Sequence, residues 1–144
     1  MDIFIARVRF PNDPSHNLVP HQMFVGKYVS QSHIEFYSIS SVLGKEKRVF
    51  SEDGSTNEEI ALISGSVQTD NGFKVPSFVD CSKGYIVTLD ATVDIERLNH
   101  RSLTPELYTK IINKVNFLKT AGKHTSYSIS LIDFISWNKK ISRR

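Results

Sequence analysis

The chain has 144 residues, 40% of them hydrophobic and 23% charged, and its formal net charge is +3. This length predicts one domain that can bury a core without disulfides or a structural metal. No apolar run approaches the ~18–20 residues that span a bilayer, and the first residues lack the basic start of a signal peptide. The single cysteine fits a reducing compartment. We therefore expect a cytoplasmic protein that does not bind a membrane. The mild positive charge favours an anionic binding partner.

Strand patterns dominate the first fifty residues. Apolar residues alternate with arginines in the second half of 3–10, and the stretches 23–28 and 34–43 are also typical of strands. Prolines and small polar residues predict a loop over 11–17. A Gly-Lys pair after the third stretch predicts a hairpin that leads into a further strand at 48–50.

The middle of the chain carries weaker signals. An asparagine followed by two glutamates predicts a short helix over 57–63, ended by Gly65. The sequence Thr-Asp-Asn-Gly at 69–72 is typical of a tight turn. Two short strand segments follow within 76–88.

The clearest helix signal lies over about 104–120. Thr104 is typical of an N-cap and Pro105 of the first helical position. One apolar stripe follows at helical spacing, formed by Leu107, Ile111, Val115 and Leu118. Gly122 is typical of the residue just beyond a helix. Residues 127–137 fit either a strand or a short helix.

These elements together predict an α+β, mainly β fold. Short strands at regular spacing favour a small curved barrel. The amphipathic helix would cover an open end or face of that barrel, because its apolar stripe must be buried against another layer.

Polar groups stand at the ends of two neighbouring predicted strands. His21 lies near the start of one, and Ser40 and Ser41 lie at the end of the next. A histidine has an ordinary pKa near ~6.5 and suits proton transfer, while serine hydroxyls donate hydrogen bonds to phosphate oxygens. The alternatives are a surface histidine without a role and a serine-rich strand end entering a turn.

Basic side chains lie near these groups, and their charges could follow an RNA backbone. They are Lys27, Lys45, Lys47, Arg48 and Lys83. For any single lysine, an exposed charge that serves solubility is the alternative. We interpret Cys81 as a small buried apolar residue rather than a nucleophile.

Several motifs occur in a suggestive order. They are Phe10-Pro11 at the end of the opening strand, Pro20-His21 at the start of the second, Ser40-Ser41 at the end of the third, the segment 75–81, and the long helix. In this order they resemble the MazF/PemK (Kid-like) toxin family, over about residues 2–120.

The resemblance implies a compact SH3-like barrel over 1–122, with 123–144 as a C-terminal extension packed on the same domain and ending in a basic tail. It implies a homodimer that binds RNA. The activity implied is that of a metal-independent endoribonuclease without a cofactor, which cleaves single-stranded RNA by attack of a 2′-hydroxyl on the adjacent phosphate. A cognate antitoxin, either a protein or an RNA, is the other implied partner.

The resemblance also implies roles for individual residues. His21 stands where the family usually has an arginine, and Ser40 where it has a threonine or serine, so His21, Ser40 and Ser41 are the catalytic candidates. His16, in the first long loop, joins the lysines as an RNA-binding candidate. Some members carry an arginine and an aspartate where this chain has Asp80 and Lys83. These departures favour the alternative of a non-catalytic RNA- or protein-binding module on the same barrel.

Overall fold

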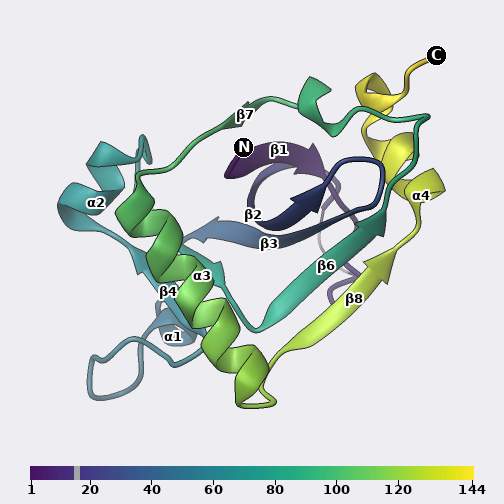
Figure 1. Cartoon of the computed structure of the whole chain (residues 1–144). Helices are drawn as coiled ribbons and strands as arrows, with labels where there is room; N and C mark the ends of the chain where they lie inside the picture. Colours follow the sequence, from purple (N-terminus) through teal and green to yellow (C-terminus); the bar gives the residue numbers. More distant parts are fainter. Residues whose placement is uncertain (15–16) are drawn as a thin grey trace.

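The computed structural model describes residues 1–14 and 17–144 (Figure 1). Its strands are β1 Ile3–Arg7, β2 Pro20–Val29, β3 His33–Ser41, β4 Ile60–Ile63, β5 Ser77–Asp80, β6 Lys83–Thr88, β7 His100–Arg101 and β8 Thr125–Ile129. Its helices are α1 Glu46–Val49, α2 Gly65–Asp70, α3 Pro105–Thr120 and α4 Leu131–Trp137, with 3-10 turns η1 Ile95–Arg97 and η2 Lys139–Ile141. The α+β, mainly β class predicted from the sequence is confirmed.

The described strands form one open sheet. Its order is β4-β5-β3-β2-β1-β7, with β6 beside β3 and β8 beside β6. Neighbouring strands are antiparallel, except that β6 and β8 run parallel. The sheet is not closed within the described residues, so the SH3-like barrel implied by the resemblance stays a prediction.

Strand β3 is the branch point of the sheet. One of its edges pairs with β2, while the other pairs with β6 at residues 33–36 and with β5 at residues 39–41. Tyr37 and Ser38 lie between these two pairings, opposite the turn that leads from Asp80 to Lys83. We call this place the fork of the sheet.

The sheet is covered on both faces. Consecutive side chains of a strand point to opposite faces, and accordingly Ile3, Phe24 and Tyr37 join the apolar cluster that includes the buried stripe of α3. Their neighbours Phe4, Met23 and Phe36 join the other cluster, which contains Phe134 of α4 and Ile141. Residues of the C-terminal segment thus belong to the second core. No helix in the described part of the chain has the length and hydropathy to cross a membrane.

The long helix α3 forms where the sequence predicts it. Thr104 Oγ1 accepts a hydrogen bond from the backbone N–H of Leu107 at 3.4 Å, and Pro105 is the first helical residue. Gly122 follows the helix with a φ of +70°, a left-handed conformation that glycine adopts without strain. The segment 127–137, which fits either a strand or a short helix, contains both. Its first residues are the end of β8, and α4 follows after Ser130.

Three local predictions are wrong. The segment 57–63 is not a helix, because β4 occupies its second half and pairs along its length with β5. The predicted strand at 48–50 is largely the short helix α1, in which Val49 is fully buried. Gly65 begins α2 rather than ending a helix, with a φ of +65°. The pairing of β4 and the burial of Val49 both come from distant residues, which outweigh local propensity.

A basic pocket at the fork of the sheet

Side chains from three strands meet on one face beside the fork. Residues two apart on a strand share a face, and this spacing selects Ser38 and Ser40 on β3, Phe78 and Asp80 on β5, and Lys83 and Tyr85 on β6. All six line one pocket of about 400 Å³. Its other lining residues are Phe10, Asn12, Asp13, His21, Lys45 and Arg48.

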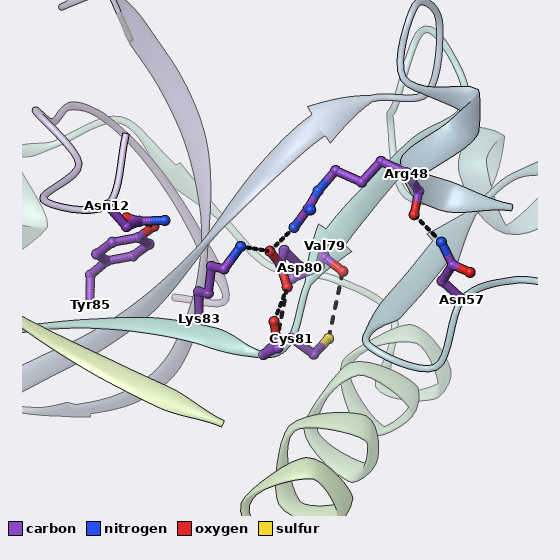
Figure 2. Close-up of polar contacts among 9 residues, drawn as sticks. Asn12, Arg48, Asn57, Val79, Asp80, Cys81, Lys83 and Tyr85 are labelled. Atoms are coloured by element: carbon purple, nitrogen blue, oxygen red, sulfur yellow. Dashed lines mark hydrogen bonds and ion pairs between the residues drawn. The ribbon is translucent and has the colours of Figure 1, made fainter. Parts of the chain in front are cut away.

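Asp80 is the buried anchor of this pocket. Its side chain is 8% exposed, and its carboxylate pairs with Arg48 and, at 3.7 Å, with Lys83 (Figure 2). Its Oδ1 also accepts hydrogen bonds from the backbone N–H of Ser82 at 3.1 Å and from the Ser82 hydroxyl at 2.7 Å. Asp80 therefore fixes two cations that come from different elements, α1 and β6.

The two cations keep a path to solvent. The side chains of Arg48 and Lys83 are 40% and 37% exposed, against 8% for Asp80. The backbone carbonyl of Arg48 accepts a hydrogen bond from the Asn57 amide, which holds the end of α1 in place (Figure 2). An anion that enters the pocket can thus approach positive charge that is already positioned.

The opposite wall is aromatic. The Phe10 ring lies 4.9 Å from the Tyr85 ring and 6.2 Å from the His21 ring, measured between centroids. The Tyr85 hydroxyl donates a hydrogen bond to Asn12 Oδ1 at 2.7 Å. Burial raises the pKa of Tyr85 to about 12, so its hydroxyl stays protonated at neutral pH.

Five of the sequence-predicted residues meet in this pocket: His21, Ser40, Lys45, Arg48 and Lys83. Ser41 lines an adjoining hollow, together with His21, Ser40 and Lys45. Lys27 and Lys47 are exposed elsewhere, on the far half of β2 and on α1, and line neither hollow. His16 lies outside the described residues.

Sequence reasoning missed several lining residues. The sequence gives no sign of a role for Asn12, Ser38 or Tyr85. It does not predict the ion pair between Arg48 and Asp80 either, since 32 positions separate the two residues. The alternation within each strand is a signal that could have placed Asp80 on the same face as Phe78, and Tyr85 on the same face as Lys83.

Cys81 lies next to Asp80 but faces away from the pocket, into the core beside α3. Its thiol donates weakly to the carbonyl of Val79 at 3.7 Å (Figure 2). Burial, and then the nearby Asp80 carboxylate, raise the pKa of the Cys81 thiol to about 12. The burial predicted for Cys81 is confirmed.

A second polar cluster lies near the fork, formed by the buried Glu35 and Tyr37, the half-buried His124 and the exposed Lys119. The Tyr37 hydroxyl donates to the Glu35 carboxylate, which also accepts from Lys119 Nζ at 2.8 Å. Tyr37 has one hydroxyl proton, so His124 must donate through Nε2 to the Tyr37 oxygen, at 2.7 Å. The cluster links β3 to the end of α3 and to the start of β8.

The ionisable groups of this cluster have shifted pKa values. Burial alone would raise the pKa of Glu35, but hydrogen bonds from Lys119 and Tyr37 outweigh burial and lower it below 4.5. Burial, and then the Lys119 cation, lower the pKa of His124 below 6.5. Both shifts favour the form drawn by the hydrogen bonds, with Glu35 ionised and His124 neutral.

No protein-family model matches the chain, and no curated protein matches it. Within residues 1–14 and 17–144, no group of three or more His, Cys, Asp or Glu side chains has an arrangement that could hold a metal ion.

Proposed function

We propose that this protein is a MazF/PemK-like toxin of a toxin–antitoxin system, an endoribonuclease that cleaves single-stranded RNA in the cytoplasm without a metal. The observation that carries the proposal is the pocket at the fork, where a histidine and a serine meet three cationic side chains. On this proposal the open sheet is a variant of the SH3-like barrel. The protein works as a homodimer under the control of a cognate antitoxin.

The reaction needs little more than proton transfer and charge stabilisation. The 2′-oxygen of the RNA bonds to the adjacent phosphorus as the bond to the 5′-oxygen breaks, leaving a cyclic phosphate and a 5′-hydroxyl. His21 accepts the proton of the attacking 2′-hydroxyl, a role that suits the imidazole. The departing 5′-oxygen takes up a proton from solvent.

The remaining groups act on the phosphate. Ser40 donates a hydrogen bond to a non-bridging oxygen, and Lys45 offsets its charge. Arg48 and Lys83 stabilise the extra negative charge of the phosphorane, and Asp80 keeps them in position beforehand. Arg48 thus offers a guanidinium to the pocket in place of the arginine that the family usually carries at the position of His21.

The test is incubation of the purified protein with a long RNA of mixed sequence in the presence of EDTA. The wild type should yield discrete fragments with 2′,3′-cyclic phosphate and 5′-hydroxyl ends, identified by mass spectrometry. His21→Ala, Ser40→Ala and Arg48→Ala should each slow cleavage by about 10²-fold or more. Lys123→Ala is the matched control, because it removes one positive charge from an exposed ion pair with Glu58, away from the pocket.

The outcome also separates the enzyme from the alternative function. The folded wild type could instead leave RNA intact and bind it in a salt-sensitive way that Arg48→Ala weakens. That result would contradict the enzyme and support the RNA-binding module. In cells, expression of the wild type should arrest growth and expression of His21→Ala should not. Light scattering of the purified chain tests the homodimer.

A further inference from the structure

A second hollow, of about 350 Å³, lies between the loop after β1 and the C-terminal segment. Phe10 and Trp137 supply its aromatic lining, and Arg9, Asp13, Ser128 and Asp133 are among its polar lining residues. Its volume falls in the range of about 300–1,000 Å³ typical of ligand pockets. Two of its walls come from β8 and α4, which follow each other along the chain beside β6 (Figure 1).

This hollow adjoins the basic pocket. Phe10 and Asp13 line both of them, so one short segment of chain forms the wall between the two. A polymer whose phosphate lies beside Arg48 and Lys83 would therefore bring a neighbouring group to Trp137. One extended ligand could therefore occupy both hollows.

The charges of the two hollows differ, and the difference favours a phosphate in the basic pocket and a base in the second hollow. The basic pocket has three permanent cations and two carboxylates, whereas the second hollow has one guanidinium and two carboxylates. Carboxylates repel a phosphate, but they accept hydrogen bonds from the N–H groups of a base edge. The aromatic lining offers the face on which an unpaired base stacks.

Guanine fits this set of groups better than the other bases. It presents two adjacent donors, N1–H and the N2 amino group, to one carboxylate, and its O6 and N7 accept from an arginine. Adenine and cytosine turn a ring-nitrogen lone pair towards a carboxylate at the corresponding position, and uracil offers a single N–H. Asp133 and Arg9 lie on the same hollow and supply the two complementary halves.

We propose that this hollow is a guanine-binding subsite that selects a nucleotide next to the scissile phosphate. This inference rests on the proposed function, because it takes RNA to be the ligand of the basic pocket. Trp137 stacks on the base, Asp133 accepts from N1–H and N2 of its Watson–Crick edge, and Arg9 donates to O6 and N7 of its Hoogsteen edge.

Trp137 makes the test direct, because it is the only tryptophan of the chain. Its fluorescence is followed while GMP, AMP, CMP or UMP is added to the full-length protein. GMP should quench it saturably, with an affinity about tenfold or more above that for the other three nucleotides. Asp133→Asn should weaken GMP binding about tenfold and leave weak AMP binding nearly unchanged. Asp70→Asn, an exposed aspartate on α2, is the matched control and should bind GMP as the wild type does.

The results distinguish failure of the subsite from failure of the enzyme. Equal quenching by all four nucleotides, no quenching by any, or GMP binding that Asp133→Asn leaves intact would overturn the subsite, even if RNA is cleaved. Guanine-selective quenching in a protein that leaves RNA intact supports the subsite and contradicts the nuclease. If both hold, cleavage sites in a long RNA should share a guanine at one fixed position, and Asp133→Asn should relax that preference without abolishing cleavage.

Discussion

The replacement Tyr37→Phe should destabilise the protein more than any other loss of a single tyrosine hydroxyl described above. Tyr37 is fully buried, and its hydroxyl joins the Glu35 carboxylate to the His124 ring. The phenylalanine ring fills the same space, so the change removes the two hydrogen bonds and leaves the packing in place. Glu35 keeps Lys119, whereas His124 Nε2 loses its acceptor within the cluster.

The size of the effect follows from these contacts. A hydrogen bond to a charged group contributes about 1.5–3 kcal/mol, and one between neutral groups about 1 kcal/mol. His124 is half-buried and can recover part of its bond with water, so we expect a total loss of about 2.5 kcal/mol. With an unfolding entropy of about 2.1 cal/mol/K per residue, this loss lowers the Tm by about 8 °C for a chain of this length.

Thermal and urea unfolding, followed by circular dichroism at pH 7.5, measure the change. Tyr127→Phe is the control, because Tyr127 stacks on Tyr85 but its hydroxyl makes no hydrogen bond to another described residue. That control should stay within about 0.5 kcal/mol of the wild type. A Tyr37→Phe protein that melts within about 2 °C of the wild type would refute the view that the cluster stabilises the fold.

Three further expectations concern stability and reactivity. His124 and Glu35 bind protons more readily in the unfolded chain than in the folded protein, because folding lowers both pKa values. The free energy of unfolding should therefore fall as the pH drops below about 6.5 and again below about 4.5. His124→Gln should flatten the first of these losses, and an unchanged profile would contradict the assignment. Gly26→Ala should cost about 1–3 kcal/mol in urea unfolding, because a Cβ at the bulge in β2 would lie 2.8 Å from the Tyr37 ring. Cys81 should react with a thiol reagent only as fast as the protein unfolds, and rapid labelling of the native protein would show that its thiol is accessible.

Local sequence signals predict the elements that are stabilised locally. Thr104, Pro105 and an apolar stripe are enough to define α3, because caps and periodicity lie within the helix itself. The same reasoning gives the wrong result for 57–63, where the cap-like asparagine and two glutamates precede a strand. Pairing with β5, which lies further along the chain, determines the structure of β4.

The candidate site, too, could be predicted from the sequence only in part. His21 and Ser40 could be expected to lie close together, because they stand at the ends of neighbouring strands. The pairing of Arg48 with Asp80 depends on β5 pairing with the end of β3, and Lys83 joins them because β6 pairs with the same edge of β3. No local pattern encodes this branching. The anchor of the pocket is therefore a product of topology, while its polar residue types are visible in the sequence.

The parallel pairing of β6 with β8 has a consequence for how the protein is made. Lys83 pairs with Thr125, and Val87 with Ile129. One edge of β6 therefore stays unpaired during translation until β8, which follows α3, has been synthesised. At translation rates of about 5–20 residues per second, this delay lasts several seconds. During that time the residues of the basic pocket are already present, but the partner strand of β6 and the Phe134 side chain that packs on Phe36 are not. A nascent chain should thus remain open at this edge until β8 and α4 emerge, and a ribosome stalled before β8 should carry a chain that a protease can cut.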